Sequence, residues 1–496
     1  VDAITGNFYT IGDINELSYA LATSLQETGV SINDVIAICS ENRLDYLIVL
    51  LAVLYVGATL APINPIYTKD ELIHCCKIYQ PKLVFATNVT LANIVQVKKS
   101  IKSIEEIIVL DDVPKVQDEC LVKYSSLIKN KTRNLKIISG DPKSQIAVIL
   151  SSSGTTGLPK GVKISHSNLL AYINNARDER ISPIRKGRRL LGLVPFFHGY
   201  GYGMMLNLIN RESEVIILPK FEETLFLGTI EKYKVEVLPM VPPLITFLAK
   251  SPLTEKYDLS SVKEIICGAA PCVESTMKEA VAKLNNAEVY HAYGMTETTI
   301  LSTVCRSDSN KFPSIGKLVP GLCCKVVDLE TGKALGPGKQ GELCFKGQYI
   351  MQGYFGDNEA TSNTIDTDGW LHSGDVGYYD NDHYFYIVDR IKELIKYKAF
   401  QVAPAELEAL LLSHPEVKDA AVIGKPHFKD GEHPTAYIVK QPKSSVTEKE
   451  LIDFVKGKVS PQKWLRGGIY FVENIPKNPS GKILRRFLRD KLKAKL

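Results

Sequence analysis

Ser151 to Gly161, S-S-S-G-T-T-G-L-P-K-G, is a stretch whose residue types could hold phosphate groups. Its hydroxyl side chains, glycines and single lysine allow backbone N–H groups, hydroxyls and an ammonium group to converge on a polyanion. The stretch is not a Walker A loop, because Gly154 and Lys160 do not stand at the offset that G-x-x-x-x-G-K-[ST] requires. The composition therefore favours a phosphate-holding loop, with a flexible Ser/Gly linker as the alternative.

The residues on either side argue against a linker. The apolar run I-A-V-I-L precedes the loop, and V-K-I-S-H-S-N-L-L-A-Y follows it. Ser165 or Ser167 can cap a helix that begins in this second segment. The sequence predicts a strand, the loop, a strand or turn, and then a helix.

Composition limits the classes of protein to consider. With 496 residues, of which 45% are hydrophobic and 23% charged, the chain is typical of a globular protein with room for two or more domains. The ten cysteines include no C-x-x-C pair and no His/Cys metal spacing, so the sequence indicates neither a zinc site nor a disulfide framework. The net charge of +5 is concentrated in the C-terminal part, but aromatic and basic residues do not interleave there. We therefore expect no nucleic-acid partner.

One apolar run, Tyr46 to Ile63, is long enough to cross a bilayer. Gly57 and Pro62 interrupt it. We expect a buried helix that ends near Gly57 and continues into an extended segment, and no membrane span.

The tripeptide Ala494-Lys495-Leu496 matches the small-basic-Leu form of the peroxisomal signal that an import receptor reads. It predicts the peroxisome as the location and the import receptor as a partner, with the cytoplasm otherwise. Because the sequence starts with Val1, we expect that residues precede it.

The order of patterns predicts an α/β protein. Short β-rich runs alternate with helical patterns through the first two thirds, which is typical of helix-flanked parallel sheets. We expect a large N-terminal domain over 1–389, with a small β-barrel-like part at 324–389. A hinge at 390–392 then leads to a smaller, mobile α+β lid domain at 393–496, in which Pro404 begins a helix.

Six further stretches, taken with the loop in their order, resemble the adenylate-forming enzymes: acyl-CoA synthetases, 4-coumarate–CoA ligases and beetle luciferases. They are F-F-H-G-Y-G-Y-G (196–203), A-Y-G-M-T-E-T-T (292–299), D-G-W-L-H-S-G-D (368–375), V-D-R-I-K (388–392), K-Y-K-A-F-Q-V-A-P-A-E-L-E (396–408) and N-P-S-G-K-I (478–483). K-Y-D-L-S (256–260), V-V-D-L-E-T-G-K (326–333) and L-R-G-G (465–468) look closest to insect luciferase-like synthetases.

This resemblance implies an ATP-dependent, AMP-forming ligase. Such enzymes join a carboxylic acid, here a fatty or aromatic acid, to the α-phosphate of ATP and then transfer the acyl group to CoA. The alternative from the same resemblance is a luciferase-type monooxygenase that oxidises adenylated luciferin. A non-enzymatic phosphate-binding module is disfavoured, because Lys160, Glu297, Asp375 and Lys482 are all present.

The resemblance also implies the nucleotide site. Tyr293 lies against adenine, Thr296 binds the α-phosphate, Asp375 accepts hydrogen bonds from the ribose with Arg390 nearby, and Glu297 holds Mg²⁺. A buried structural tyrosine and a turn aspartate remain the alternatives for Tyr293 and Asp375. The full set of nucleotide-binding residues that we expect is Ser151, Ser152, Gly154, Thr155, Thr156, Gly157, Lys160, Gly268, Ala269, Ala270, Tyr293, Gly294, Thr296, Asp375 and Arg390.

Two lysines are implied for two chemical steps. Lys482 resembles the lysine that bridges the carboxylate and the α-phosphate during adenylation, together with Thr296. Lys398 resembles the residue that faces the adenylate in the second step, so the small domain is expected to rotate between the steps. Ala399 follows Lys398 where the family usually has glycine, and a methyl group there hinders close backbone approach or positive φ in the conformation for the second step.

The acid pocket is expected around His198, which follows a predicted strand in an aromatic, glycine-rich loop, with a structural histidine as the alternative. Tyr200 and Arg177 are further candidates. Ile300 and Leu301 stand where luciferases have small residues, and Phe197 stands where they have a first histidine. These differences favour a synthetase and an apolar acid other than luciferin.

Overall fold

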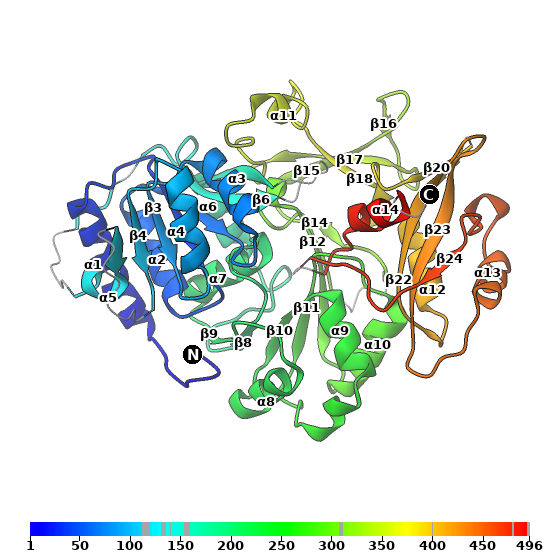
Figure 1. Ribbon diagram of the computed structural model, residues 1–496, viewed down its shortest axis with the longest axis horizontal. Helices are drawn as coiled ribbons and strands as arrows, with labels where there is room; N and C mark the ends of the chain where they lie inside the picture. Colours follow the sequence, from blue (N-terminus) through cyan, green and yellow to red (C-terminus); the bar gives the residue numbers. More distant parts are fainter. Residues whose placement is uncertain are drawn as a thin grey trace.

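The computed structural model describes residues 1–111, 120–129, 135–138, 140–152, 159–306, 311–398, 400–478 and 481–493. Four β-sheets with flanking helices make up this part of the chain (Figure 1). The predicted α/β class, with a large N-terminal part and a smaller α+β C-terminal part, is confirmed.

The first sheet is doubly wound, because alternate strand residues face two different helical layers. Its strands stand in the order β5 (Leu121–Lys123), β4 (Glu106–Val109), β3 (Leu83–Ala86), β1 (Val35–Cys39), β2 (Thr59–Ile63), β6 (Ile146–Ser152) and β7 (Lys160–Ser165). Its helices are α1 (Ile11–Glu27), α2 (Asp45–Tyr55), α3 (Lys69–Tyr79), α4 (Leu91–Ser100), α5 (Tyr124–Leu127) and α6 (His166–Asn175). All neighbours pair in parallel except β6 and β7, which pair antiparallel.

The second sheet presents the ends of several parallel strands at one edge. Its strands are β14 (Lys317–Leu318), β13 (Thr303–Arg306), β12 (Glu288–Tyr293), β11 (Glu264–Cys267), β10 (Val237–Met240), β8 (Arg189–Gly192) and β9 (Glu214–Ile217). Its helices are α7 (Gly199–Arg211), α8 (Glu223–Tyr233), α9 (Pro242–Lys250) and α10 (Glu274–Lys283), with 3₁₀ turns at Pro252–Lys256 and Thr296–Thr298. Strands β9, β8, β10, β11 and β12 are neighbours in this order and run parallel. The loops that follow β8, β11 and β12 therefore meet at the same edge.

The third sheet is antiparallel and leads into the hinge. Its strands stand in the order β16 (Ala334–Leu335), β15 (Leu322–Val327), β17 (Gly341–Gly347), β18 (Leu371–Tyr379) and β19 (Phe385–Arg390), and α11 covers Asn358–Ser362. The sheet ends at Arg390, where the predicted hinge begins.

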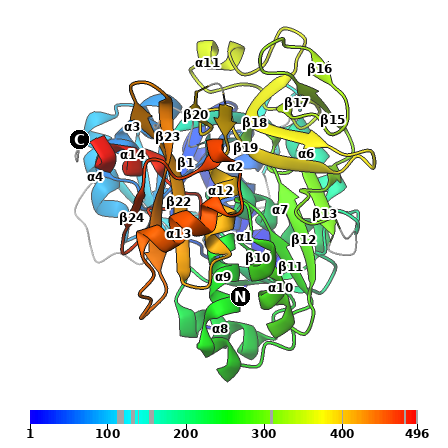
Figure 2. The same ribbon diagram turned by 90° about the vertical axis from the view of Figure 1, so that its right-hand side faces the viewer.

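The fourth sheet and its helices form the C-terminal part, in front in Figure 2. The strands are β21 (Phe400–Val402), β20 (Ile395–Tyr397), β23 (Gly431–Lys440), β22 (Val417–His427) and β24 (Ile469–Phe471). The helices are α12 (Pro404–Leu412), α13 (Glu448–Lys456) and α14 (Arg485–Lys493), with a 3₁₀ turn at Pro461–Lys463. Pro404 stands in the first turn of α12, as predicted.

Local expectations about two segments are confirmed. The apolar run from Tyr46 is the buried helix α2, which ends before Gly57 and continues into β2. The phosphate loop lies between β6 and β7, and Ser165 caps α6 by accepting a hydrogen bond from the Asn168 N–H.

Among the described residues, none of the helices combines the length and the apolar character needed to cross a bilayer. None of the ten cysteines, all of them described, forms a disulfide.

A buried ion pair joins the last helix to the rest of the C-terminal part. The Arg485 Nη2 atom lies 2.7 Å from both carboxylate oxygens of Glu408, and Glu408 also accepts a hydrogen bond from the Val422 N–H. Only about a tenth of either side chain is exposed. The pair therefore fixes α14 against α12 and β22, and with them the segment that carries Lys482.

Arg485→Leu is expected to destabilise the C-terminal part by about 3 kcal/mol, because it leaves the Glu408 carboxylate buried without its cation. The double variant Arg485→Leu/Glu408→Leu should recover part of that loss. Urea unfolding measures the change. Arg486→Leu is the matched control, since Arg486 is 61% exposed and its loss should cost less than about 0.5 kcal/mol. Equal effects of Arg485→Leu and Arg486→Leu would contradict the prediction.

Candidate active site

The ends of the phosphate loop are fixed by the pairing of β6 with β7. Ser151 stands opposite Gly161 and Ser152 opposite Lys160, so the two strands form a hairpin. The Ser151 hydroxyl lies 2.8 Å from the Tyr79 hydroxyl. The loop residues Gly154, Thr155, Thr156 and Gly157 lie outside the described residues.

Glu297 lies beside the base of this hairpin. It is 5% exposed, and its Oε1 atom accepts hydrogen bonds from the Ser152 hydroxyl at 2.7 Å and the Tyr354 hydroxyl at 3.0 Å. The Lys160 ammonium lies 4.8 Å from the centre of the Tyr354 ring and 3.9 Å from the Asp357 carboxylate. Tyr354 thus positions both the carboxylate and the lysine of the expected phosphate site.

Asp375 joins the expected adenine and ribose residues. Its Oδ2 atom accepts a 2.6 Å hydrogen bond from the Tyr293 hydroxyl, and its Oδ1 atom lies 3.1 Å from Arg390 Nε. Burial, followed by the Asp375 charge, raises the pKa of Tyr293 well above its ordinary value. Tyr293 therefore stays a neutral hydrogen-bond donor, and the carboxylate is held in one orientation.

Lys482 reaches this region from the C-terminal part. Burial, and then the Arg390 charge, lowers the pKa of Lys482 to about 8. The carboxylates of Asp375, Glu393 and Glu297 act in the opposite direction. The charges that act on the pKa of Lys482 belong to residues of both expected nucleotide regions. The structure therefore brings the predicted catalytic lysine to the predicted nucleotide site.

The adjacent Gly481 makes this approach possible. Its φ of 81° is in the left-handed region that favours glycine. A methyl group at this position would lie 2.8 Å from Cδ of Pro243, in the first turn of α9. A larger residue would therefore push the Lys482 segment away from the N-terminal part.

His198 is the N-cap residue of α7 and lines an apolar pocket. Its Nδ1 atom accepts a 3.3 Å hydrogen bond from the Tyr200 N–H, so the neutral ring carries its proton on Nε2. Burial, and then the Lys482 charge, lowers the pKa of His198 to about 4. At neutral pH this imidazole is a hydrogen-bond donor without a charge.

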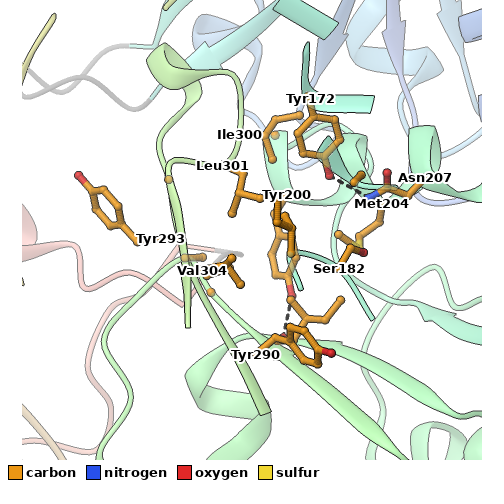
Figure 3. Close-up of a pocket in the computed structure, with 18 of the residues that line it drawn as sticks. Tyr172, Ser182, Tyr200, Met204, Asn207, Tyr290, Tyr293, Ile300, Leu301 and Val304 are labelled. Atoms are coloured by element: carbon orange, nitrogen blue, oxygen red, sulfur yellow. Dashed lines mark hydrogen bonds between the residues drawn. The ribbon is translucent and has the colours of Figure 1, made fainter. Parts of the chain in front are cut away.

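The pocket itself has a volume of about 90 Å³ and lies at the edge where the loops after β8, β11 and β12 meet. Figure 3 shows Tyr293 on one side and Asn207 and Met204 on the other, with Leu301 and Tyr200 between them. Gly268, Ala269, Gly294, Thr296 and Ile300 also line the pocket, as does His198.

One wall of this pocket has a strained backbone, which hydrogen bonds hold in place. Thr299 and Ile300 both have positive φ, 46° and 79°, which is unusual for β-branched residues. The Thr299 hydroxyl donates a hydrogen bond to the Tyr349 carbonyl oxygen, and the Ile300 N–H donates to the Met295 carbonyl oxygen. A methyl group on Gly294 would lie 1.9 Å from the Ile300 carbonyl oxygen, so a close backbone approach requires this glycine.

Among the expected site residues, Arg177, Ala270 and Lys398 lie neither in the pocket lining nor in the contacts described above. Arg177 is exposed and donates a hydrogen bond to the Asn210 side chain. Ala270 follows Ala269 outside the lining. Lys398 lies in the turn between β20 and β21, where its ammonium is 3.7 Å from the Asp430 carboxylate. Ala399 lies outside the described residues, as does the tripeptide Ala494-Lys495-Leu496.

Sequence reasoning missed three residues that shape this site: Tyr354, Glu393 and Gly481. Tyr354 follows Gly353 in M-Q-G-Y-F-G, and Glu393 follows the hinge. Neither position carries a motif of its own. Gly481 stands directly before Lys482 in N-P-S-G-K, so the sequence did offer a signal there, since glycine beside a catalytic residue indicates close packing.

Comparisons with known proteins agree with this geometry. The chain matches the family model described as AMP-binding enzyme over residues 2–355, and the AMP-binding enzyme C-terminal domain over residues 406–482. It is 41% identical to luciferin 4-monooxygenase of Nipponoluciola cruciata, over 99% of this chain and 91% of that protein. It is 38% identical to probable 4-coumarate–CoA ligase 1 of Dictyostelium discoideum, with the same coverage. ATP-bound MatB of Rhodopseudomonas palustris superposes with a TM-score of 0.87 at 27% identity, over 97% of this chain and 93% of that one.

The His198 imidazole is expected to stay neutral down to about pH 4, and Lys482→Ala should raise its pKa, because a positive neighbour is removed. NMR titration of ¹⁵N-labelled histidine measures both values. Lys482→Arg keeps the charge and serves as the control. An unchanged His198 pKa in Lys482→Ala would show that the two side chains do not interact.

Proposed function

Since this chain belongs to the AMP-binding family of adenylate-forming enzymes, we propose that it is an ATP-dependent acid–CoA ligase. It activates a carboxylic acid with ATP, forming an acyl adenylate and pyrophosphate, and then transfers the acyl group to the thiol of CoA. The observation that carries the proposal is the position of Lys482, a partly buried cation whose pKa responds to the charges of Asp375, Glu297 and Arg390 and whose own charge acts on His198 at the acid pocket.

The nucleotide would span the two regions that flank Lys482. Ser151, Ser152 and Lys160 stand at the base of the phosphate loop, and Tyr293, Asp375 and Arg390 form the side for adenine and ribose. To bind, the ribose must share the Asp375 carboxylate with the two partners that now orient it. This requirement favours a small rearrangement of Tyr293 and Arg390 when ATP enters.

Glu297 is suited to hold Mg²⁺. Among the residues that the structure describes, the Ser152 and Tyr354 hydroxyls both donate to Oε1, so Oε2 is open to a cation there, and hard cations prefer such oxygen ligands. A bound Mg²⁺ would neutralise charge on the phosphates. Ser152 and Tyr354 would keep the carboxylate in place as it does so.

Lys482 and His198 have different parts in the first step. With a pKa of about 8, Lys482 is mostly protonated at neutral pH and can stabilise the charge that grows as the carboxylate attacks the α-phosphate. Thr296, which lines the same pocket, would donate a hydrogen bond to that phosphate. The neutral His198 can donate its Nε2–H to an oxygen of the acid without adding a second cation beside Lys482.

The acid should be apolar, either fatty or aromatic. Leu301, Ile300, Met204 and Val304 contribute apolar walls, and the free volume of about 90 Å³ fits a compact group as the walls stand. A longer chain requires side chains to move, and Met204 is well suited to this because methionine adapts its shape.

A luciferase-type monooxygenase is the second candidate. The identity of 41% with a luciferin 4-monooxygenase supports it, while the bulky Ile300 and Leu301 in the pocket favour the ligase. In that case the adenylated acid would be oxidised with emission of light rather than passed to CoA.

Acid-dependent ATP–pyrophosphate exchange across a panel of fatty and aromatic acids, followed by mass spectrometry of the CoA product, tests the proposal. We expect exchange with at least one acid and formation of its CoA thioester. Strong light emission with D-luciferin and no exchange with any acid of the panel would favour the monooxygenase. No acid-dependent exchange and no light would reject both.

The two lysines are expected to separate the two steps. Lys482→Ala should slow adenylation about 100- to 1000-fold, because it removes a transition-state cation, yet leave thioester formation from supplied acyl adenylate. Lys398→Ala should slow only thioester formation. Lys396→Ala is the control for both steps, because Lys396 is an exposed lysine on β20, two residues before Lys398. Single-turnover measurements distinguish the steps, and equal loss of both steps in either variant would reject this division.

A further inference from the structure

A second cluster of metal-ligand side chains lies in the C-terminal part, in the hairpin between β22 and β23. His427 ends β22, Asp430 lies in the turn and His433 stands on β23. His433 Nε2 lies 2.9 Å and His427 Nδ1 3.5 Å from the same oxygen, Asp430 Oδ2. The two imidazole rings stack, with centres 3.9 Å apart. All three ligand atoms lie within 4.8 Å of one another.

One of these atoms is unsatisfied. Among the described residues, His427 Nδ1 is buried and has no hydrogen-bond partner. Buried polar atoms normally have a partner, and leaving one without a partner is costly. The hairpin therefore contains a ring nitrogen that lies 3.5 Å from the Asp430 carboxylate without forming a hydrogen bond to it.

We propose that His427, Asp430 and His433 bind a transition-metal dication of the zinc class. Two imidazoles and one carboxylate suit zinc, whereas Mg²⁺ prefers a shell of oxygen ligands. Atoms bound at about 2.1 Å to a tetrahedral ion stand about 3.4 Å apart, close to the 2.9 and 3.5 Å observed here. Because an imidazole binds a metal in the plane of its ring, the two stacked rings must turn out of their stacked arrangement for both nitrogens to face one ion. The search of the sequence for His/Cys metal spacings missed this site, because its ligands follow the different pattern H-x-x-D-x-x-H across a hairpin.

The other cluster with metal-ligand chemistry, Glu342, Cys344 and His372, does not suit a metal as well. Glu342 already accepts hydrogen bonds from the Gly374 N–H and from His372 Nδ1. The second ring nitrogen of His372 lies 3.7 Å from Asp366. These contacts supply partners for the Glu342 carboxylate and the His372 ring and fix β18 just before Asp375. This cluster therefore has a structural role.

The hairpin site also contacts the turn that carries Lys398. The Lys398 N–H donates a 2.7 Å hydrogen bond to the Asp430 carbonyl oxygen, and its ammonium lies 3.7 Å from Asp430 Oδ1. The φ of Lys398 is 52°, in the left-handed region. A metal on Asp430 would withdraw the carboxylate from the Lys398 ammonium and stiffen the turn. If the proposed function holds, a bound metal therefore slows thioester formation and spares adenylation.

Metal binding is tested with the purified full chain after treatment with a chelator. Zn²⁺ affinity is measured by competition with a chromophoric chelator, and Co²⁺ provides a visible ligand-field spectrum. We expect one tight Zn²⁺ per chain. His427→Asn and His433→Gln should each weaken it by at least about tenfold, since even partners outside the ligand shell contribute that much. His372→Asn is the matched control and should leave the affinity unchanged.

Two results would overturn the site: no stoichiometric Zn²⁺ binding by the native chain, or binding that persists in both His427→Asn and His433→Gln. Circular dichroism verifies that each variant folds, and Asp430→Asn provides a third variant should one histidine variant fail.

Coupling to Lys398 has its own measurement. Zn²⁺ should slow amide hydrogen exchange in the β20–β21 turn of the native chain and not of His427→Asn. It should also slow thioester formation from supplied acyl adenylate severalfold in the native chain alone, without changing pyrophosphate exchange. Unchanged exchange of the turn on Zn²⁺ binding would reject the coupling while leaving the site. Because the exchange measurement needs no substrate, it remains decisive even if the ligase activity is not found.

Discussion

The organisation of this protein depends on placing the positive charge of Lys482 in a largely buried site. Removing a charge from water costs several kcal/mol unless nearby groups compensate. Here three carboxylates, Asp375, Glu297 and Glu393, oppose the effects of burial and of Arg390 on the lysine. Glu297 lies in the 3₁₀ turn after β12, Asp375 on β18 of the third sheet and Glu393 directly after the hinge. The site is therefore complete only when the C-terminal part docks on the N-terminal part.

Electrostatics also explains why His198 must be neutral. A cationic imidazole beside Lys482 would repel it, and burial would raise the cost of both charges. The hydrogen bond from the Tyr200 N–H to Nδ1 selects the tautomer with a proton on Nε2. One backbone contact at the start of α7 thus determines which end of the ring can meet the acid. The helix cap and the acid-binding group are the same residue.

Much of the fold could be predicted because its signals are local. Gly57 ends α2, Ser165 caps α6 and Pro404 opens α12, and each acts through its own backbone chemistry. The site was less predictable, because its supports come from distant segments. Tyr354 bonds to Glu297 across 57 positions of the chain, and no periodicity marks such a pair. Arg177 is a related case: its neighbour Ala176 lines the pocket, but the helix ends there and the Arg177 guanidinium donates to Asn210 outside the lining.

The left-handed backbone at Thr299 and Ile300 has a consequence for how this pocket could evolve. A β-branched residue at positive φ stores about 1–3 kcal/mol of strain. Replacing Ile300 with glycine would both enlarge the pocket and release that strain. Most changes that widen a cavity lower stability, because they remove packed side-chain atoms. At this position the strain that is released offsets part of that loss, so adaptation to a bulkier acid would cost less stability here than at an unstrained wall residue.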